Sequence, residues 1–165
     1  MARSMKEVHT INYYPINEGA ARRAKEMNSF SDYKEGSATA EYRAMVDKAA
    51  AIAEQQKSRV DPMYHEKIDH LLDTYARKLA ENMNQGFAID ARVPSVMIAG
   101  PANFPVGKKE KQNRARDSNM EEWRYIQGRW IRYAVPAWAG SVPMTRQRLK
   151  SSRRSWTGWN APSSL

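Results

Sequence analysis

The sequence predicts a mainly α-helical protein, and three observations predict it. Apolar residues recur at three- and four-residue spacing in two long segments, capping residues precede the helix starts, and helix-forming residues dominate between residues 18 and 127. The length of 165 residues suits one domain with its own core and is short for two. We expect packed helices with at most one short strand.

The first two elements are predicted to be helices. Residues 18–27 follow Asn17, which can cap a helix start, and they have helix-forming composition with few large apolar side chains. A polar link over residues 29–36 leads into a second segment, which extends to about Ser58. Its apolar residues at helical spacing are Tyr42, Met45, Val46, Ala49, Ile52 and Ala53. This segment is predicted to be an amphipathic helix.

A long helix is predicted to begin at Asp61-Pro62. The Asp61 side chain can cap the helix start, and a proline at the first helical position sacrifices no hydrogen bond. Gly86 is suited to end this helix. The apolar stripe between these limits consists of Ile68, Leu71, Leu72, Tyr75, Leu79 and Met83. We expect the two amphipathic helices to pair as an antiparallel hairpin.

Residues 93–99 break the helical pattern. They form a short apolar and partly β-branched run, which Gly100-Pro101 and then Pro105 close. The run is predicted to be either a short strand or a buried extended segment.

The segment after Pro105 returns to helix formers through about Gln127 and begins with a group of cations. These are Lys108, Lys109, Lys111, Arg114 and Arg116. At about 100° per residue they spread over about 220° of the helix, a face too wide and too charged to be buried. Apolar spacing resumes only with Met120, Trp123 and Ile126. We therefore expect the helix to dock by its C-terminal half and to project its basic start into solvent.

Residues 129–165 differ in kind from the rest of the chain. They hold four of the five tryptophans, no acid and seven of the nine net positive charges. When Trp130 onward is back-translated and read shifted by one nucleotide, one permissible codon choice gives a glycine-rich turn, a helix start and regularly spaced leucines. We therefore predict a single helical domain over residues 1–128, and we hypothesise that the basic tail over residues 129–165 is out of frame.

Several kinds of chemistry are excluded or disfavoured. The chain has no cysteine, which excludes disulfides and thiolate chemistry. His65 and His70 are five residues apart, so on a helix they point about 140° away from each other and cannot share a metal ion. Gly100 and Gly107 are separated by six residues where a P-loop has four. We expect no enzymatic activity, no metal and no cofactor.

The N-terminus lacks the apolar run of a signal peptide, and no segment is long and apolar enough to span a bilayer. We therefore expect a cytoplasmic protein with no membrane partner.

The basic segment is the candidate binding site. Only one acid, Glu110, falls among the five cations, and Asn103 and Phe104 complete the site on its N-terminal side. Clustered Lys and Arg gain free energy when they displace counterions from phosphates, and they also suit an acidic groove on a protein. A helix start next to lysines can also hold an anion. The alternative is a solvated face without a partner.

Three segments resemble a poorly characterised protein family. They are residues 93–123 (VPSVMIAGPANFPVGKKEKQNRARDSNMEEW), residues 25–33 (KEMNSFSDY) and the helix over residues 60–86. That family is encoded on phages and conjugative elements of gut bacteria. The resemblance covers about residues 20–128, after which the relatives continue with a sequence much like the shifted-frame reading. Gly107 stands where they tend to have arginine. The resemblance implies a mobile-element context and no particular reaction.

Three functions are compatible with these observations. The first is a non-enzymatic inhibitor of a host defence nuclease such as a CRISPR effector, which would act like an anti-CRISPR protein by binding the effector or its nucleic acid. The second is a DNA-binding accessory protein of a phage or conjugative element. The third is a helical fragment of a larger polypeptide with a scaffolding role.

Overall fold

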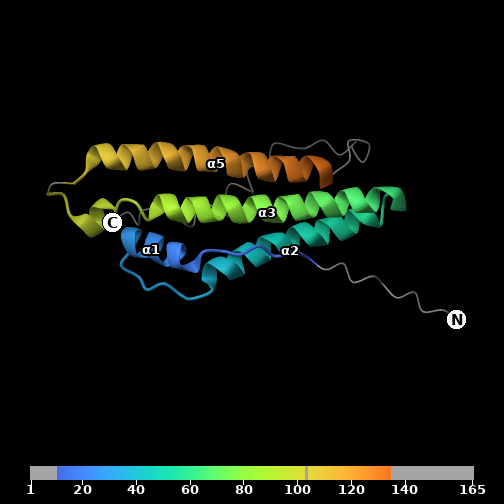
Figure 1. Ribbon diagram of the computed structural model, residues 1–165, viewed down its shortest axis with the longest axis horizontal. Coiled ribbons are helices and arrows are strands. Elements are labelled where there is room, and N and C mark those ends of the chain that lie inside the picture. The colour runs from blue at the N-terminus through green and yellow to red at the C-terminus, as the bar shows by residue number, and fades with distance from the viewer. Residues whose placement is uncertain (1–10, 103, 135–165) are drawn as a thin grey trace, which may run out of the picture. The chain divides into compact units, whose positions relative to one another are not determined.

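The computed structural model describes residues 11–102 and 104–134, apart from the side chains of residues 132–134. These residues form five α-helices and one turn of 3₁₀-helix, and no strand is found among them. The elements are α1 (Glu18–Asn28), α2 (Ser37–Lys57), η1 (Pro62–Tyr64), α3 (His65–Asp90), α4 (Val96–Ala99) and α5 (Val106–Ala134) (Figure 1). The predicted mainly α fold class is confirmed.

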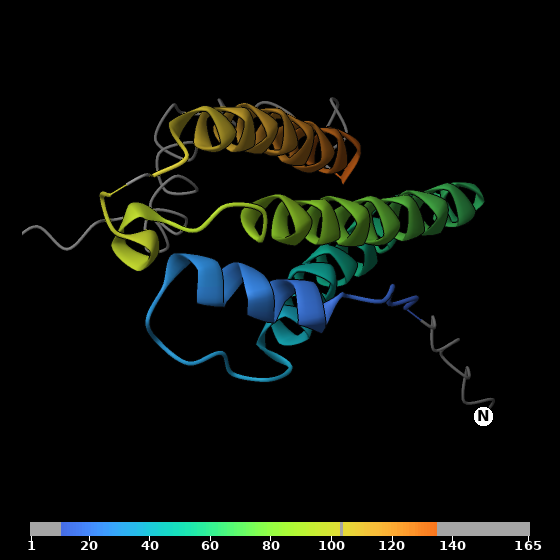
Figure 2. The same ribbon diagram turned by 60° about the vertical axis from the view of Figure 1, so that its left-hand side comes forward.

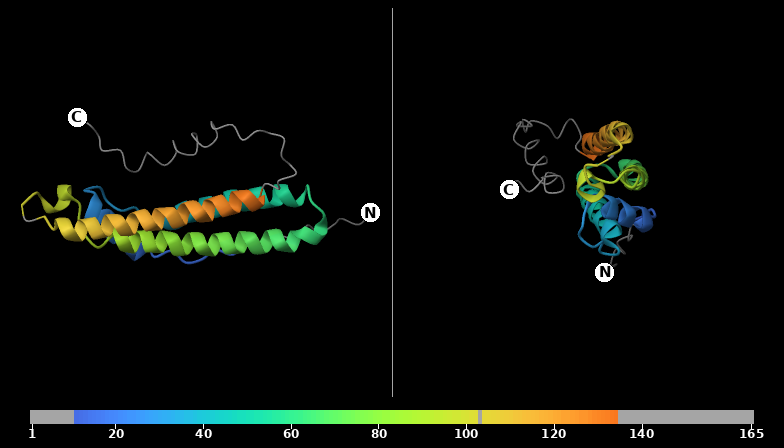
Figure 3. Two further views of the ribbon diagram at one scale, coloured as in Figure 1. Left: turned by 90° about the horizontal axis from the view of Figure 1, so that it is seen from above. Right: turned by 90° about the vertical axis from the view of Figure 1, so that its left-hand side faces the viewer.

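Helix α3 lies at the centre of the bundle. It contacts α1, α2 and α5. Figures 1 and 2 show α5 along one side of α3 and α1 and α2 along the other, and the end-on view on the right of Figure 3 shows the same order. Helices α2 and α3 run in opposite directions and are joined at η1, as the predicted hairpin requires. None of the described helices combines the length and apolarity needed to cross a bilayer.

The predicted capping residues are found at the helix starts. Asn17 accepts a hydrogen bond from the Ala20 N–H at 2.9 Å and opens α1. Asp61 accepts one from the Met63 N–H at 3.0 Å and opens η1, which leads directly into α3. Helix α2 has no such side chain, because its N-cap is Gly36 with φ of 75°. Glycine adopts this left-handed backbone without a steric penalty.

Glu18 supplies the missing cap of α2 from a different helix. Its carboxylate accepts hydrogen bonds from the backbone N–H groups of Thr39 at 2.7 Å and Gly36 at 3.2 Å, and from the hydroxyls of Thr39 and Tyr33. A helix start leaves such N–H groups without internal partners. Burial alone would raise the pKa of Glu18, but these hydrogen bonds outweigh it and hold the pKa below its ordinary value. One carboxylate therefore ties the start of α1 to the start of α2.

Tyr42 is the centre of the core between α2 and α3. Its side chain is fully buried, and the hydroxyl donates to the Ala76 carbonyl at 3.1 Å and accepts from the Tyr14 N–H at 3.0 Å. Both bonds are needed because a buried tyrosine hydroxyl without a partner is costly. Small residues of the two helices, such as Ala53 and Ala80, are buried in the same core.

Residues 11–17 have no regular secondary structure but are bound along α3. The Tyr14 hydroxyl donates to the Asp73 carboxylate at 3.0 Å. Asn84 accepts from the Asn17 N–H at 2.8 Å and donates to the Pro15 carbonyl at 3.0 Å. Asp73 and Asn84 lie about three turns apart on α3, so these contacts hold the segment against the helix and position Tyr14 over Tyr42.

Helix α5 packs on α3 through a seven-residue repeat. Its buried and half-buried contact positions are Lys109, Gln112, Arg116, Asn119, Trp123, Ile126 and Trp130. The facing positions Tyr75, Asn82 and Ile89 on α3 are also seven residues apart. Contacts run in order along the antiparallel pair, from Gln112 with Ile89, through Asn119 with Asn82, to Trp130 with Tyr75. The two helices therefore keep one register along the seam, as in an antiparallel coiled coil.

The seam corrects the expectation that α5 docks only by its C-terminal half. Gln112 is 2% exposed, so the N-terminal half of α5 is docked as well. The contact positions of the N-terminal half are polar, whereas those of the C-terminal half are aromatic or aliphatic. A search for apolar spacing alone therefore detects only the second half of this interface.

Gly86 lies inside α3 and does not end it, contrary to the prediction. The helix continues to Asp90. A Cβ atom at Gly86 would lie 3.1 Å from Nδ2 of Asn119, so glycine leaves the space that the asparagine occupies. Beside it, the buried Asn82 donates to the carbonyl oxygen of Asn119 at 2.9 Å and to its Oδ1 at 3.1 Å.

Residues 96–99 form one helical turn, α4, so both alternatives predicted for residues 93–99, a short strand and a buried extended segment, are wrong for these four residues. Val93 is buried, whereas Val96 and Met97 are exposed. The Ser95 N–H donates to the Met27 carbonyl at 2.8 Å and fixes this turn at the end of α1. A strand needs a partner for its backbone groups, and the described residues contain no other strand.

The expected domain boundary at residue 128 is not observed. Helix α5 continues through Gly128 to Ala134. Trp130 is 6% exposed, and its ring centroid lies 5.4 Å from that of Tyr75, so it belongs to the core. Residues 135–165, which contain most of the atypical tail, lie outside the described residues.

The Gly86 contact predicts opposite outcomes for two glycines. Gly86→Leu should lower the free energy of unfolding by about 1–3 kcal/mol, because the new side chain must displace Asn119. Gly128→Leu should not, because a Cβ there meets nothing within 4 Å and leucine favours a helix more than glycine does. Urea denaturation of both variants measures the difference. Equal stability of the two variants would contradict the proposed role of Gly86.

Candidate partner-binding surface

The start of α5 carries an excess of positive charge. The Lys109 N–H donates to the Pro105 carbonyl at 3.0 Å, which begins the helical hydrogen bonding, and the first turn contains no acid. The N-terminus of a helix has a partial positive charge of its own. The lysines therefore add to this charge instead of neutralising it, and the end of the helix attracts anions.

The structure separates the five predicted cations into two sets. Lys108, Lys111 and Arg114 are exposed, whereas Lys109 and Arg116 are half-buried and contact the end of α3 or the link after it. The expectation that the whole basic start projects into solvent is therefore wrong. The reason is the seven-residue repeat, because Lys109 and Arg116 occupy contact positions of the seam.

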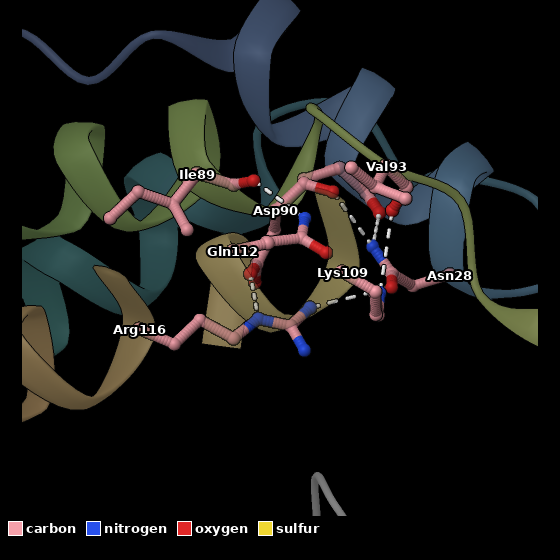
Figure 4. A network of polar contacts seen from close by, with 8 residues as sticks. Asn28, Ile89, Asp90, Val93, Lys109, Gln112 and Arg116 are labelled. Atoms are coloured by element: carbon pink, nitrogen blue, oxygen red, sulfur yellow. Dashed lines mark hydrogen bonds and ion pairs between the residues drawn. The ribbon is translucent and has the colours of Figure 1, made fainter. Parts of the chain in front are cut away.

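Arg116 joins the ends of two helices. Its Nε pairs with the Asp90 carboxylate at the end of α3, and Nη2 donates to Oδ1 of Asn28 at 3.4 Å (Figure 4). Asn28, at the end of α1, donates from Nδ2 to the Asp90 carbonyl at 3.1 Å. The contacts close a loop of three residues from three helices, through both the carboxylate and the backbone carbonyl of Asp90. We refer to Asn28, Asp90, Lys109, Gln112 and Arg116 as the polar clamp.

Lys109 extends the clamp to the link after α3. Its Nζ donates to the Val93 carbonyl at 3.4 Å. Burial lowers the pKa of Lys109 below its ordinary value, and the nearby Arg116 lowers it further, while Asp90 acts in the opposite direction. A lysine held in this way is part of the fold and is less available to a partner than its exposed neighbours.

Gln112 is one of three clamp residues, with Asn28 and Asp90, that the sequence did not predict. Its Nε2 donates to the Ile89 carbonyl at 2.6 Å, in the last turn of α3, where a helix leaves carbonyl groups available. The seven-residue spacing could have identified it. Extended from the apolar contact positions in the C-terminal half of α5 towards the N-terminus, the same repeat also reaches the polar contact positions of the N-terminal half. One heptad before Ile126 is Asn119, and a second heptad leads to Gln112.

The exposed set forms what we call the cationic row, Lys108, Lys111 and Arg114. Its members are three residues apart, so they extend about 9 Å along the helix and drift by about 120° around it. None of them forms an ion pair with a described residue. Of the other two predicted site residues, Phe104 is half-buried before α5, and Asn103 lies outside the described residues.

A second charged feature of the described surface is acidic. A groove of about 470 Å³ lies between α2, α3 and residues 11–12, and Glu54, Glu66 and Asp73 are among its lining residues. Lys57 pairs with Asp69 at its edge.

Within the described ranges, no three His, Cys, Asp or Glu side chains are placed to hold a metal ion. Of the two histidines of the rejected zinc motif, His65 lies 3.0 Å from the Lys57 carbonyl through its Nε2.

Comparison of the chain with protein-family models, with characterised proteins and with solved structures gives no match. Its function is therefore inferred from the surface chemistry described above.

The division of the cations predicts which arginine stabilises the fold. Arg116→Ala should lower the free energy of unfolding by about 1 kcal/mol, because it leaves the half-exposed Asp90 and the Asn28 amide without their shared partner. Arg114→Ala, two residues away, should change it by less than about 0.5 kcal/mol. Urea denaturation at low and high salt provides the measurement. Equal effects of the two substitutions would contradict the clamp.

Proposed function

We propose that this protein is a non-enzymatic inhibitor of a host defence nuclease, encoded by a phage or conjugative element and acting in the cytoplasm like an anti-CRISPR protein. The observation that carries the proposal is the cationic row, three exposed cations without ion partners in the described structure, beside the positive end of a helix. Such a surface favours contact with nucleic acid held by an effector, or with an acidic groove of the effector itself.

The rigidity of this surface supports a role in binding. The polar clamp fixes the start of α5 to the ends of α1 and α3, so the backbone under the cationic row is already ordered before a partner binds. Prior order reduces the entropy that association costs. Inhibition would then result from occlusion, in which the row occupies a surface that the nuclease needs for its substrate.

The place of the row in the fold gives further support. Two of the three segments that carry the family resemblance, residues 25–33 and 93–123, are far apart in sequence but meet in the structure. The Met27 carbonyl accepts from the Ser95 N–H, and Asn28 contacts Arg116. The cationic row therefore lies within one of the segments that carry the resemblance, near the place where two of these segments meet.

Inhibition assays on purified CRISPR effectors with guide RNA test this proposal. The wild-type protein should reduce DNA cleavage by at least one effector, and Lys108→Ala/Lys111→Ala/Arg114→Ala should weaken inhibition by about tenfold to a hundredfold, since each exposed charge contact contributes about 0.5–1 kcal/mol. The matched control is Arg23→Ala/Lys48→Ala/Lys67→Ala, which removes the same charge from exposed positions on α1, α2 and α3. Loss of inhibition in both variants would show that only net charge matters.

A DNA-binding accessory protein of the mobile element is the second candidate, and the regular spacing of the cationic row favours it. Three cations over about 9 Å match the rise of about three nucleotides along one strand of a duplex. This function needs no nuclease partner.

Duplex binding as a function of salt distinguishes this candidate. If the row contacts three phosphates, removal of all three cations should reduce the slope of log K against log salt by about 2.7. Fluorescence anisotropy with duplexes of unrelated sequence provides the measurement, and the control triple variant should keep the wild-type slope. An unchanged slope in the cationic-row variant would exclude this surface as the DNA site.

A further inference from the structure

The end of the bundle that carries the cationic row also exposes large apolar side chains. Among the described residues, ten large hydrophobic residues are exposed, and four of them lie here. We refer to these four as the apolar end: Phe30, Val96, Met97 and Val106. Phe30 and Met97 are each 75% exposed. Single exposed apolar residues are common on proteins, but a group of them at one place indicates an interaction site.

Hydrogen bonds bring the four residues to the same end of the fold. The bond from the Ser95 N–H to the Met27 carbonyl, at 2.8 Å, joins the start of α4 to the end of α1. Phe30 follows Met27 by three residues, and Met97 follows Ser95 by two. Figures 1 and 2 show α4 beside the end of α1, and they show the start of α5, where Val106 is the first helical residue, at the same end of the bundle.

The polar clamp holds this end in place. Each of the three segments that present apolar residues is anchored within a few residues of them, through Asn28, Val93 and Lys109. Aromatic and methionine side chains are enriched at the cores of protein–protein interfaces.

We propose that the apolar end and the cationic row form one docking surface for an acidic protein surface with an apolar pocket. This inference rests on the proposed function and specifies it further: the partner is the nuclease protein itself, and nucleic acid is not the main contact. Charge complementarity identifies the partner as acidic, because the row begins two residues after Val106 and has no ion partner in the described residues. The apolar residues gain affinity by burial in a pocket of the partner, and a phosphate backbone offers no such pocket.

Nearby acids favour a protein over nucleic acid or membrane. Asp32 is exposed two residues after Phe30, and Glu110 is exposed between Lys108 and Lys111. A continuous layer of phosphates or anionic lipid headgroups would be repelled by both carboxylates. A protein partner can instead place a neutral or cationic group opposite each of them.

The test uses the effector that the wild-type protein inhibits, with Phe30→Ser/Met97→Ser as the variant. Both side chains are largely exposed, so the melting temperature should not change. The expected result is an increase of about tenfold or more in the concentration needed for half-maximal inhibition. Binding to a short DNA duplex should stay at the wild-type level. Met63→Ser/Tyr64→Ser is the matched control, because these exposed residues lie in η1, where α2 joins α3, at the opposite end of the bundle.

Three results would overturn the inference. If Phe30→Ser/Met97→Ser inhibits as well as wild type while the cationic-row variant does not, the proposed function stands and the apolar docking surface is wrong. If wild type binds vesicles of equal parts phosphatidylcholine and phosphatidylserine and the apolar variant does not, the apolar end is a membrane surface. If wild type inhibits no effector, the proposed function fails, and the nuclease is not the partner of this surface.

Discussion

The contact between the buried Asn82 and the half-buried Asn119 sets the register of α3 against α5, and the contacts of the polar clamp depend on that register. Gly86 leaves the space for the second asparagine, and the first donates both of its amide hydrogens to that residue. A slip along the seam would leave buried amide groups unpaired, at a cost of about 1–3 kcal/mol each. An apolar pair would tolerate such a slip more easily. A polar layer of this kind specifies one alignment among several that apolar packing would allow.

Register determines which cations remain available to a partner. With Asn119 opposite Asn82, one heptad towards the start of α5 places Gln112 opposite Ile89, and Arg116 then reaches Asp90. Lys109 and Arg116 are used by the fold as a result. Lys108, Lys111 and Arg114 stay in solvent because they fall between the contact positions. The exposed row is therefore a consequence of helix packing and does not follow from the density of lysine and arginine in the sequence.

Local signals in the sequence predicted the local structure well. Asn17 and Asp61 mark helix starts, and apolar spacing identified α2 and α3, because caps and amphipathic stripes act within a few residues. The polar contacts could not be predicted in the same way. Glu18 caps a helix other than its own, and Asn84 holds residues 15–17, so each depends on how distant segments pack. Gly86 was misread because glycine ends helices and also admits close neighbours, and sequence alone does not distinguish the two.

The segments joined by the polar clamp must be held in place while the side chains on their outer faces stay exposed. The ends of α1 and α3 and the start of α5 must be fixed, and polar side chains fix them without covering their outer faces. An apolar interface at this end would have buried Phe30 and Met97 to gain stability, whereas hydrogen bonds and an ion pair leave both exposed. Because the clamp joins backbone segments, the backbone positions that carry the exposed side chains are held relative to one another. The backbone under such a surface therefore has little conformational entropy left to lose when a partner binds.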